Sequence, residues 1–290
     1  MSAPRFRIRC WGTRGTCPSP GPLTARYGGN TSCIEVRSTS GALLVLDAGT
    51  GIRGLGAQIV KESDDTPVHL FLSHQHGDHV FGLPHFAPLL TREQPVCLYC
   101  GNADAESAQP YLQALLSPPM FPLVNGVYER LRVCDWAHGG VANVEPDIRV
   151  FRLRAQHPGE AAVLRIDDAH GPAIGYAPDN ELAYADTSPG TCAWRASLIE
   201  ALRGIPLLVH DATYRDDELA PHVGWGHSSG EEATRFALEC GARILLLFHH
   251  HPDRSDGDVD IMLGQCREIV RIAGSTLTVA AAYEGQVLSL

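Results

Sequence analysis

Residues 70–84 read LFLSHQHGDHVFGLP and place three histidines and an aspartate within six positions, directly after an apolar run. These residues are His74, His76, Asp78 and His79. Neutral imidazole binds zinc and other first-row divalent metals, and a carboxylate adds negative charge that can hold two such ions. Gly77 can relieve a tight turn that brings the side chains to one point. The pattern favours a metal site over a chance surface cluster or a helix cap.

Polar residues also follow three later apolar runs. RAQHPG contains His157, GYAPDN contains Asp179, and LLLFHHHPD contains the triplet 249–251. Residues that follow strands of a sheet can meet at one rim of that sheet. The sequence therefore predicts that these side chains complete a metal centre with the first group.

HQHGDH and the later His, Asp and His resemble the metallo-β-lactamase superfamily of metal-dependent hydrolases, whose H-x-H-x-D-H motif has the same order. The ligands that this resemblance implies are His74, His76 and His157 for one ion, Asp78, His79 and a final histidine for the other, and Asp179 as the bridge. For the final ligand we choose His249, which directly follows the apolar run, with His250 as the alternative. The resemblance also implies that Asp47, in LLVLDAGTG, is a buried structural carboxylate.

Short apolar runs bounded by turn residues predict strands, and helical periodicity predicts helices at about 51–62, 80–91, 104–116, 194–203, 229–240 and 259–273. The expected strands are FRIRCWG, SCIEVRS, ALLVLDAG, VHLFLSH, VCLYCG, IRVFRLRAQ, AAVLRID, AIGYAPD, LLVHDA and ARILLLFHH. This order predicts a single α+β domain over residues 1–290, a four-layer αββα sandwich of two mixed β-sheets flanked by helices. The irregular segment at about 117–147 is expected to be a surface insertion.

A second resemblance narrows the choice within the superfamily. His76 argues against the oxygen-reducing diiron branch, which has Glu there, and Asp179 argues against the β-lactamases, which have Cys. HDATY and GWGHSSGEEA resemble the ribonuclease Z and related phosphodiesterase branch, in which an acid at a strand end pairs with a histidine that opens a later helix. The pair here would be Asp211 and His227, although ribonuclease Z usually has Glu in place of Asp211.

The resemblance implies a catalytic role for three residues. His227 would protonate the departing alkoxide, Asp211 would orient its imidazole, and Asp78 would align the attacking water as well as bind metal. The other interpretation of His227 is that it caps the helix that follows. Two residues are candidates for substrate binding: His222, in a glycine-containing loop, and Arg14, whose guanidinium could receive a phosphate. Either could instead be a structural residue of its loop.

Composition limits the function classes. The 290 residues carry a formal net charge of −10 and contain no Lys/Arg cluster, which argues against avid, nonspecific nucleic-acid binding. No apolar window approaches the roughly 18 residues of a membrane span, and the first residues lack the apolar core of a signal peptide, so we expect a cytoplasmic protein. The nine cysteines are scattered and do not form a disulfide framework.

The leading prediction is a dinuclear metal-dependent phosphodiesterase that acts on a small phosphodiester, with a cyclic nucleotide as the first candidate, through a hydroxide that the ions generate. Zinc is the expected metal, and manganese or iron(II) would also fit. The alternatives are a tRNA 3′-processing endoribonuclease, a hydrolase of carboxyl esters, thioesters or lactones, and a metal-stabilised binding protein without turnover. The resemblance further implies a homodimer, and extended nucleic acid and membranes are not expected as partners.

Overall fold

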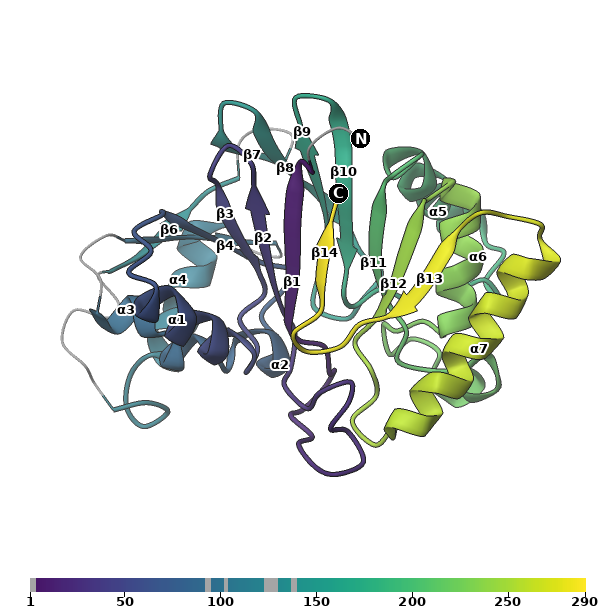
Figure 1. The fold of residues 1–290 in the computed structure, drawn as a ribbon, viewed down its shortest axis with the longest axis horizontal. Helices are drawn as coiled ribbons and strands as arrows, with labels where there is room; N and C mark the ends of the chain where they lie inside the picture. Colours follow the sequence, from purple (N-terminus) through teal and green to yellow (C-terminus); the bar gives the residue numbers. More distant parts are fainter. Residues whose placement is uncertain (1–3, 92–94, 102–103, 123–129, 137–139) are drawn as a thin grey trace.

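The computed structural model describes residues 4–91, 95–101, 104–122, 130–136 and 140–290. Two β-sheets lie face to face between two outer layers of helices (Figure 1). The predicted αββα sandwich is thereby confirmed. None of the helices in the described residues has both the length and the apolar character needed to cross a membrane.

The first sheet is mixed and has the order β14-β1-β2-β3-β4-β5-β6. Its strands are β1 (Phe6–Gly12), β2 (Cys33–Ser38), β3 (Leu43–Leu46), β4 (Val68–Leu72), β5 (Val96–Cys100), β6 (Leu131–Cys134) and β14 (Val287–Ser289). Pairing is antiparallel from β14 to β3 and parallel from β3 to β6. Helix α1 (Ile52–Lys61) joins β3 to the parallel β4, as such a crossover requires, and α4 (Ala105–Leu115) follows β5.

The second sheet has the order β13-β12-β11-β10-β9-β8-β7. Its strands are β7 (Val141–Glu145), β8 (Ile148–Arg154), β9 (Ala162–Asp168), β10 (Gly171–Ala177), β11 (Leu207–Asp211), β12 (Ile244–Phe248) and β13 (Thr278–Ala281). Pairing is antiparallel from β7 to β10 and parallel from β10 to β13. Helices α5 (Pro189–Ala201), α6 (Gly230–Cys240) and α7 (Asp256–Ile272) connect the parallel strands and cover the outer face (Figure 1).

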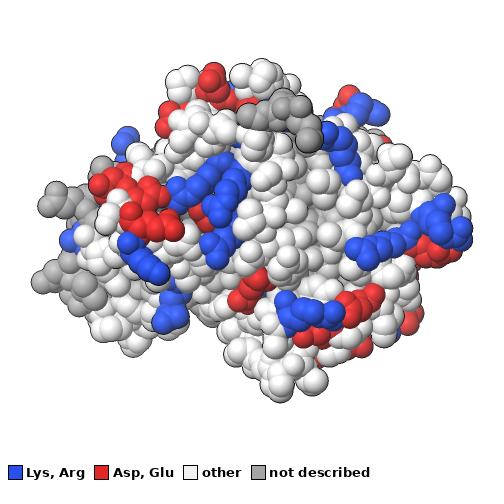
Figure 2. All heavy atoms as spheres, viewed as in Figure 1, with Lys and Arg blue, Asp and Glu red and all other residues white. Residues whose placement is uncertain are grey.

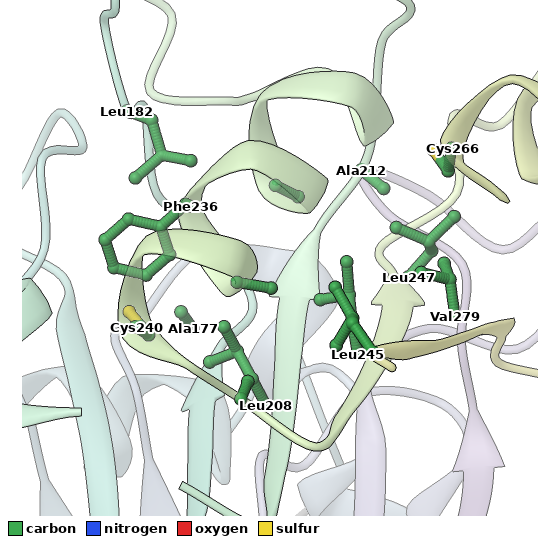
Figure 3. Packing of buried hydrophobic residues seen from close by; sticks show 14 of the residues in the cluster. Ala177, Leu182, Leu208, Ala212, Phe236, Cys240, Leu245, Leu247, Cys266 and Val279 are labelled. Atoms are coloured by element: carbon green, nitrogen blue, oxygen red, sulfur yellow. The ribbon is translucent and has the colours of Figure 1, made fainter. Parts of the chain in front are cut away.

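Three apolar layers hold the sandwich together. Phe71, Tyr176 and Phe248 belong to the layer between the two sheets. Outside the second sheet, Phe236 of α6 lies over the strands that carry Leu208 and Leu245 (Figure 3). Each large side chain that is fully buried in these layers contributes about 1.5–3 kcal/mol of transfer free energy. The layers therefore fix the strand ends, from which the polar residues of the centre project.

The structure corrects three of the sequence predictions. The helix expected at 80–91 is divided into α2 (Gly77–Val80), a 3₁₀ turn Leu83–His85 and α3 (Ala87–Thr91), since Pro84 and Pro88 lack the amide hydrogen that a continuous helix needs. The segment 117–147 is not only a surface insertion, because it supplies the edge strands β6 and β7 and carries the chain from one sheet to the other; 123–129 and 137–139 lie outside the described residues. The C-terminal strands β13 and β14 were not predicted.

Candidate metal centre

The predicted ligands follow the carboxyl ends of four strands. His74 and His76 come after β4, and Asp78 and His79 lie in the short helix α2 that follows. His157, Asp179 and His249 come after β8, β10 and β12 of the second sheet. The structure brings all seven residues together at the rim where the two sheets meet.

The seven side chains form two groups that share one carboxylate. In each group the potential ligand atoms lie within 4.8 Å of one another: His74, His76 and His157 in the first, and Asp78, His79, Asp179 and His249 in the second. Oδ2 of Asp179 lies 3.7 Å from Nε2 of His74 and 3.6 Å from Nε2 of His157. Its Oδ1 lies 2.9 Å from Nε2 of His79 and 3.2 Å from Nε2 of His249. Asp179 therefore presents one oxygen to each group, as a bridging ligand does.

Hydrogen bonds orient four of the five imidazoles. Nδ1 of His79 contacts Oδ2 of Asp47 at 2.8 Å, and Nδ1 of His157 contacts the carbonyl oxygen of Gly226 at 2.9 Å. The Ser73 hydroxyl donates to Asp47, so it accepts from Nδ1 of His74 at 3.0 Å. The Thr213 hydroxyl donates to the carbonyl oxygen of His249, so it accepts from Nδ1 of the same residue at 2.9 Å. In the neutral form of each ring this arrangement places the proton on Nδ1, so Nε2 would be the atom that binds a metal ion.

Asp47 ties the centre to the core of the sandwich. It is fully buried, as the resemblance implied, and accepts hydrogen bonds from the backbone and hydroxyl of Ser73, from His79 and from Tyr176. Its φ of 61° lies in the left-handed region, which aspartate tolerates better than most residues do. One carboxylate thus joins the end of β3 to the metal-binding loop and to β10.

The donor set fits divalent metal ions. Nε2 of His74, Nε2 of His79 and Oδ1 of Asp179 are buried, and none has a partner with hydrogen-bonding geometry among the described residues. Nδ1 of His76 lies 3.1 Å from Nε2 of His157, so two ring nitrogens face each other. Burial alone lowers the pKa of His79, but Asp179, Asp78 and Asp47 raise it well above its usual value. The carboxylates therefore attract positive charge, which a metal cation would supply.

His227 and Asp211 form the predicted pair. Nδ1 of His227 lies 2.7 Å from Oδ2 of the fully buried Asp211, which leaves Nε2 on the other side of the ring. Burial would lower the pKa of His227, but the Asp211 carboxylate and its hydrogen bond raise it to about 9 in the metal-free protein. His227 does not cap α6, because the N-cap is Ser229, whose hydroxyl accepts from the backbone of Glu232. The shorter acid of this chain therefore still reaches the imidazole.

Arg14 does not reach the centre, contrary to prediction. Its guanidinium is fully buried and donates to the carbonyl oxygens of Gly28, His251 and Arg254, so it holds the N-terminal loop and is not accessible to a phosphate. His250 also lies outside the cluster, because its Nε2 donates to the carbonyl oxygen of Ala282. His222 is half-buried on the loop before His227, and its role in substrate binding stays a prediction.

Two contacts at the centre were not predicted from the sequence. The backbone N–H of Thr16 donates to Oδ2 of Asp78 at 2.8 Å, from a residue with φ of 63°. The buried carboxylate of Glu181 accepts from the backbone N–H groups of Gly224 and Gly226 in the turn before His227. No local pattern marks Thr16, whereas the position of Glu181 two residues after Asp179 was a signal that could have been used.

Comparisons with known proteins agree with this geometry. The family model of the beta-lactamase superfamily domain matches residues 43–250. A ribonuclease Z from Haloarcula marismortui is 29% identical over 286 residues, covering 84% of this chain and 86% of that protein. The uncharacterised protein Rv1339 of Mycobacterium tuberculosis is 31% identical over 222 residues, covering 74% of this chain and 72% of that protein.

Solved structures share the fold at low sequence identity. The metallo-β-lactamase fold protein YhfI from Bacillus subtilis matches 99% of this chain and 100% of that chain, with a TM-score of 0.72 and 20% identity. The short form of human tRNase Z matches 98% of both chains, with a TM-score of 0.60 and 19% identity. The chain thus belongs to the β-lactamase superfamily, and it is a metal-dependent hydrolase.

Proposed function

We propose that this hydrolase is a dinuclear phosphodiesterase that cleaves small phosphodiesters, with cyclic nucleotides as the first substrates to test. The observation that carries the proposal is the hydrogen bond between His227 and Asp211 at the edge of the donor cluster. Phosphodiesters release alkoxides, which are poor leaving groups unless a proton is supplied. A protonated imidazole at this position meets that requirement.

The residues divide the work between the metal centre and the proton donor. The two groups that share Asp179 would hold two divalent ions, with zinc as the first candidate, and when bound such ions activate water and neutralise charge on a phosphoryl group. Asp78, fixed by the Thr16 N–H, would orient the attacking water. His227 would donate its Nε2 proton to the leaving oxygen, and Asp211 would hold the ring in the required tautomer.

The surface charge of the protein and its similarity to ribonuclease Z are two arguments about the size of the substrate. On the face in Figure 2, basic side chains occur in small groups, several beside acidic ones, and no continuous basic surface crosses the face. With a net charge of −10, this distribution favours a small anion over a long nucleic acid. The similarity to ribonuclease Z over 84% of the chain keeps tRNA 3′ processing as the second candidate. A homodimer and a cytoplasmic location stay predictions.

The first test compares two chromogenic substrates on protein of known metal content. We expect hydrolysis of bis(p-nitrophenyl) phosphate to require added zinc or manganese after chelation, and to exceed hydrolysis of p-nitrophenyl acetate. Cleavage of the acetate alone would replace this proposal with the carboxyl-ester alternative. Cyclic nucleotides and a precursor tRNA then separate the two phosphodiester candidates.

Replacement of the proton donor tests the mechanism. His227→Ala is expected to lower the hydrolysis of substrates with alkoxide leaving groups, such as cyclic nucleotides, by about 10²–10⁴-fold. Hydrolysis of bis(p-nitrophenyl) phosphate should fall much less, because p-nitrophenolate departs without a proton. Metal content should stay the same, since the seven predicted ligands do not include His227 and its Nδ1 is engaged by Asp211. Equal losses on both substrates would assign His227 another role.

A further inference from the structure

A large cavity lies directly beside the metal centre. Its volume is about 970 Å³, and its wall includes the predicted ligand His157, Trp194 of α5 and the backbone of Gly224 and Gly226. A phosphodiester bound at the metal ions would therefore have room for a substituent of nucleoside size on this side. Val223, Gly224 and Gly226, from the turn that precedes His227, also line this wall, and Trp225 lies between them in the chain.

This turn exposes two apolar side chains although its backbone is held firmly. Val223 is 70% and Trp225 59% exposed. The Glu181 carboxylate, only 7% exposed, accepts from the N–H of Gly224 at 2.9 Å and from the N–H of Gly226 at 2.8 Å. The carbonyl oxygen of Gly226 in turn accepts from Nδ1 of His157. The indole of Trp225 is thus presented to solvent by a turn that is fixed to the metal centre.

Aromatic rings connect Trp225 to the candidate proton donor. The ring centroids of Trp225 and His222 lie 4.9 Å apart in an edge-to-face arrangement, and His222 stacks on Tyr214 at 4.3 Å. Tyr214 lies 6.1 Å from the ring of His227. The row therefore runs from the exposed rim to the imidazole that faces the leaving oxygen.

We infer that Trp225 is a stacking platform for the base of a nucleoside on the leaving side of the substrate. The inference rests on the proposed function, because the leaving oxygen is the atom that His227 would protonate. In a nucleotide the base is joined through the sugar to that oxygen. Any of the planar bases can stack on an aromatic ring. The substrate class is then a nucleoside phosphodiester, and Trp225 favours substrates that carry a base over those that do not.

Binding of two phosphate monoesters to the metal-loaded protein tests this inference by calorimetry. AMP and ribose 5-phosphate share the phosphate and the sugar, and only AMP carries a base. We expect AMP to bind the wild-type protein about tenfold more tightly. Trp225→Ala should bring the ratio close to one by weakening AMP alone, and Trp225→Phe should retain most of the preference. Tyr283→Ala, which removes another exposed aromatic ring, should leave the ratio unchanged.

Two outcomes would overturn the inference: a ratio near one in the wild-type protein, or a preference for AMP that persists in Trp225→Ala. The result is independent of turnover, so it separates the two proposals. If diesters are cleaved but the ratio does not depend on Trp225, only the stacking platform is wrong. If the ratio depends on Trp225 but no diester is cleaved, the proposed phosphodiesterase activity is wrong.

Discussion

At the scale of single residues, the sequence was sufficient to predict ligands that lie in one short motif or directly follow an apolar run. The motif HQHGDH and His249 at the end of an apolar run were enough to predict which side chains meet. Arg14 was assigned wrongly because its guanidinium is bound by carbonyl oxygens of residues 251 and 254, which are more than two hundred positions away. Such backbone contacts leave no pattern of residue types, so they could not be predicted.

The variant Gly226→Ala tests whether the turn before His227 must lie close to the predicted metal ligand His157. In Gly226→Ala the new Cβ would lie 2.1 Å from Nδ1 of His157, and φ is +87°. We expect His157 to be displaced and the first metal group to lose its ion, which elemental analysis after dialysis would measure.

Gly224→Ala is the matched control. Its φ is +84°, but its Cβ would meet nothing within 4 Å. It should be destabilised by about 1–2 kcal/mol through backbone strain alone and keep its metal. Equal metal content in both variants would show that His157 tolerates displacement of this turn.

At the scale of elements, most strands were predictable because burial and alternation leave a periodic signal. The prediction of one continuous helix at 80–91 was wrong because Pro84 and Pro88 interrupt it. Strands β6 and β7 were not predicted because they lie in a segment rich in turn residues. Edge strands are short and partly exposed, so their sequences differ little from loops. The pairing of β14 with β1, across the whole chain, could not be derived from local pattern either.

The variant Asp47→Asn tests whether the Asp47 carboxylate joins the elements around the metal centre. Asp47→Asn keeps a side chain that tolerates the left-handed backbone, but an amide has one acceptor oxygen where the carboxylate uses two. At least one buried donor among Ser73, His79 and Tyr176 then loses its partner. We expect the free energy of unfolding to fall by about 2–4 kcal/mol, measured by urea denaturation of the metal-free protein.

The control for Asp47 is Asp217→Asn. The Asp217 side chain is 72% exposed and pairs with Arg215, so its replacement should change the free energy of unfolding by less than about 0.5 kcal/mol. If Asp47→Asn were equally mild, the Asp47 carboxylate would not be the link between β3, the metal-binding loop and β10.

At the scale of the whole molecule, the centre connects the two sheets. Four of the predicted ligands follow β4 of the first sheet, and three follow strands of the second. Ions bound there would therefore link the two halves of the sandwich, and they would offset the repulsion between the buried carboxylates of Asp78 and Asp179. Stability and activity should depend on the same ions.

Removal of the metal should lower the melting temperature. An ion at a thousand times its dissociation constant stabilises the folded state by about 4 kcal/mol, which corresponds to roughly 7 °C for a domain of this size. Thermal denaturation with and without a chelator would measure the shift, and zinc added back should restore it. Asp179→Ala removes the shared ligand, so its melting temperature should respond much less to the chelator. A wild-type melting temperature that is the same with and without metal would mean that the ions do not hold the two sheets together.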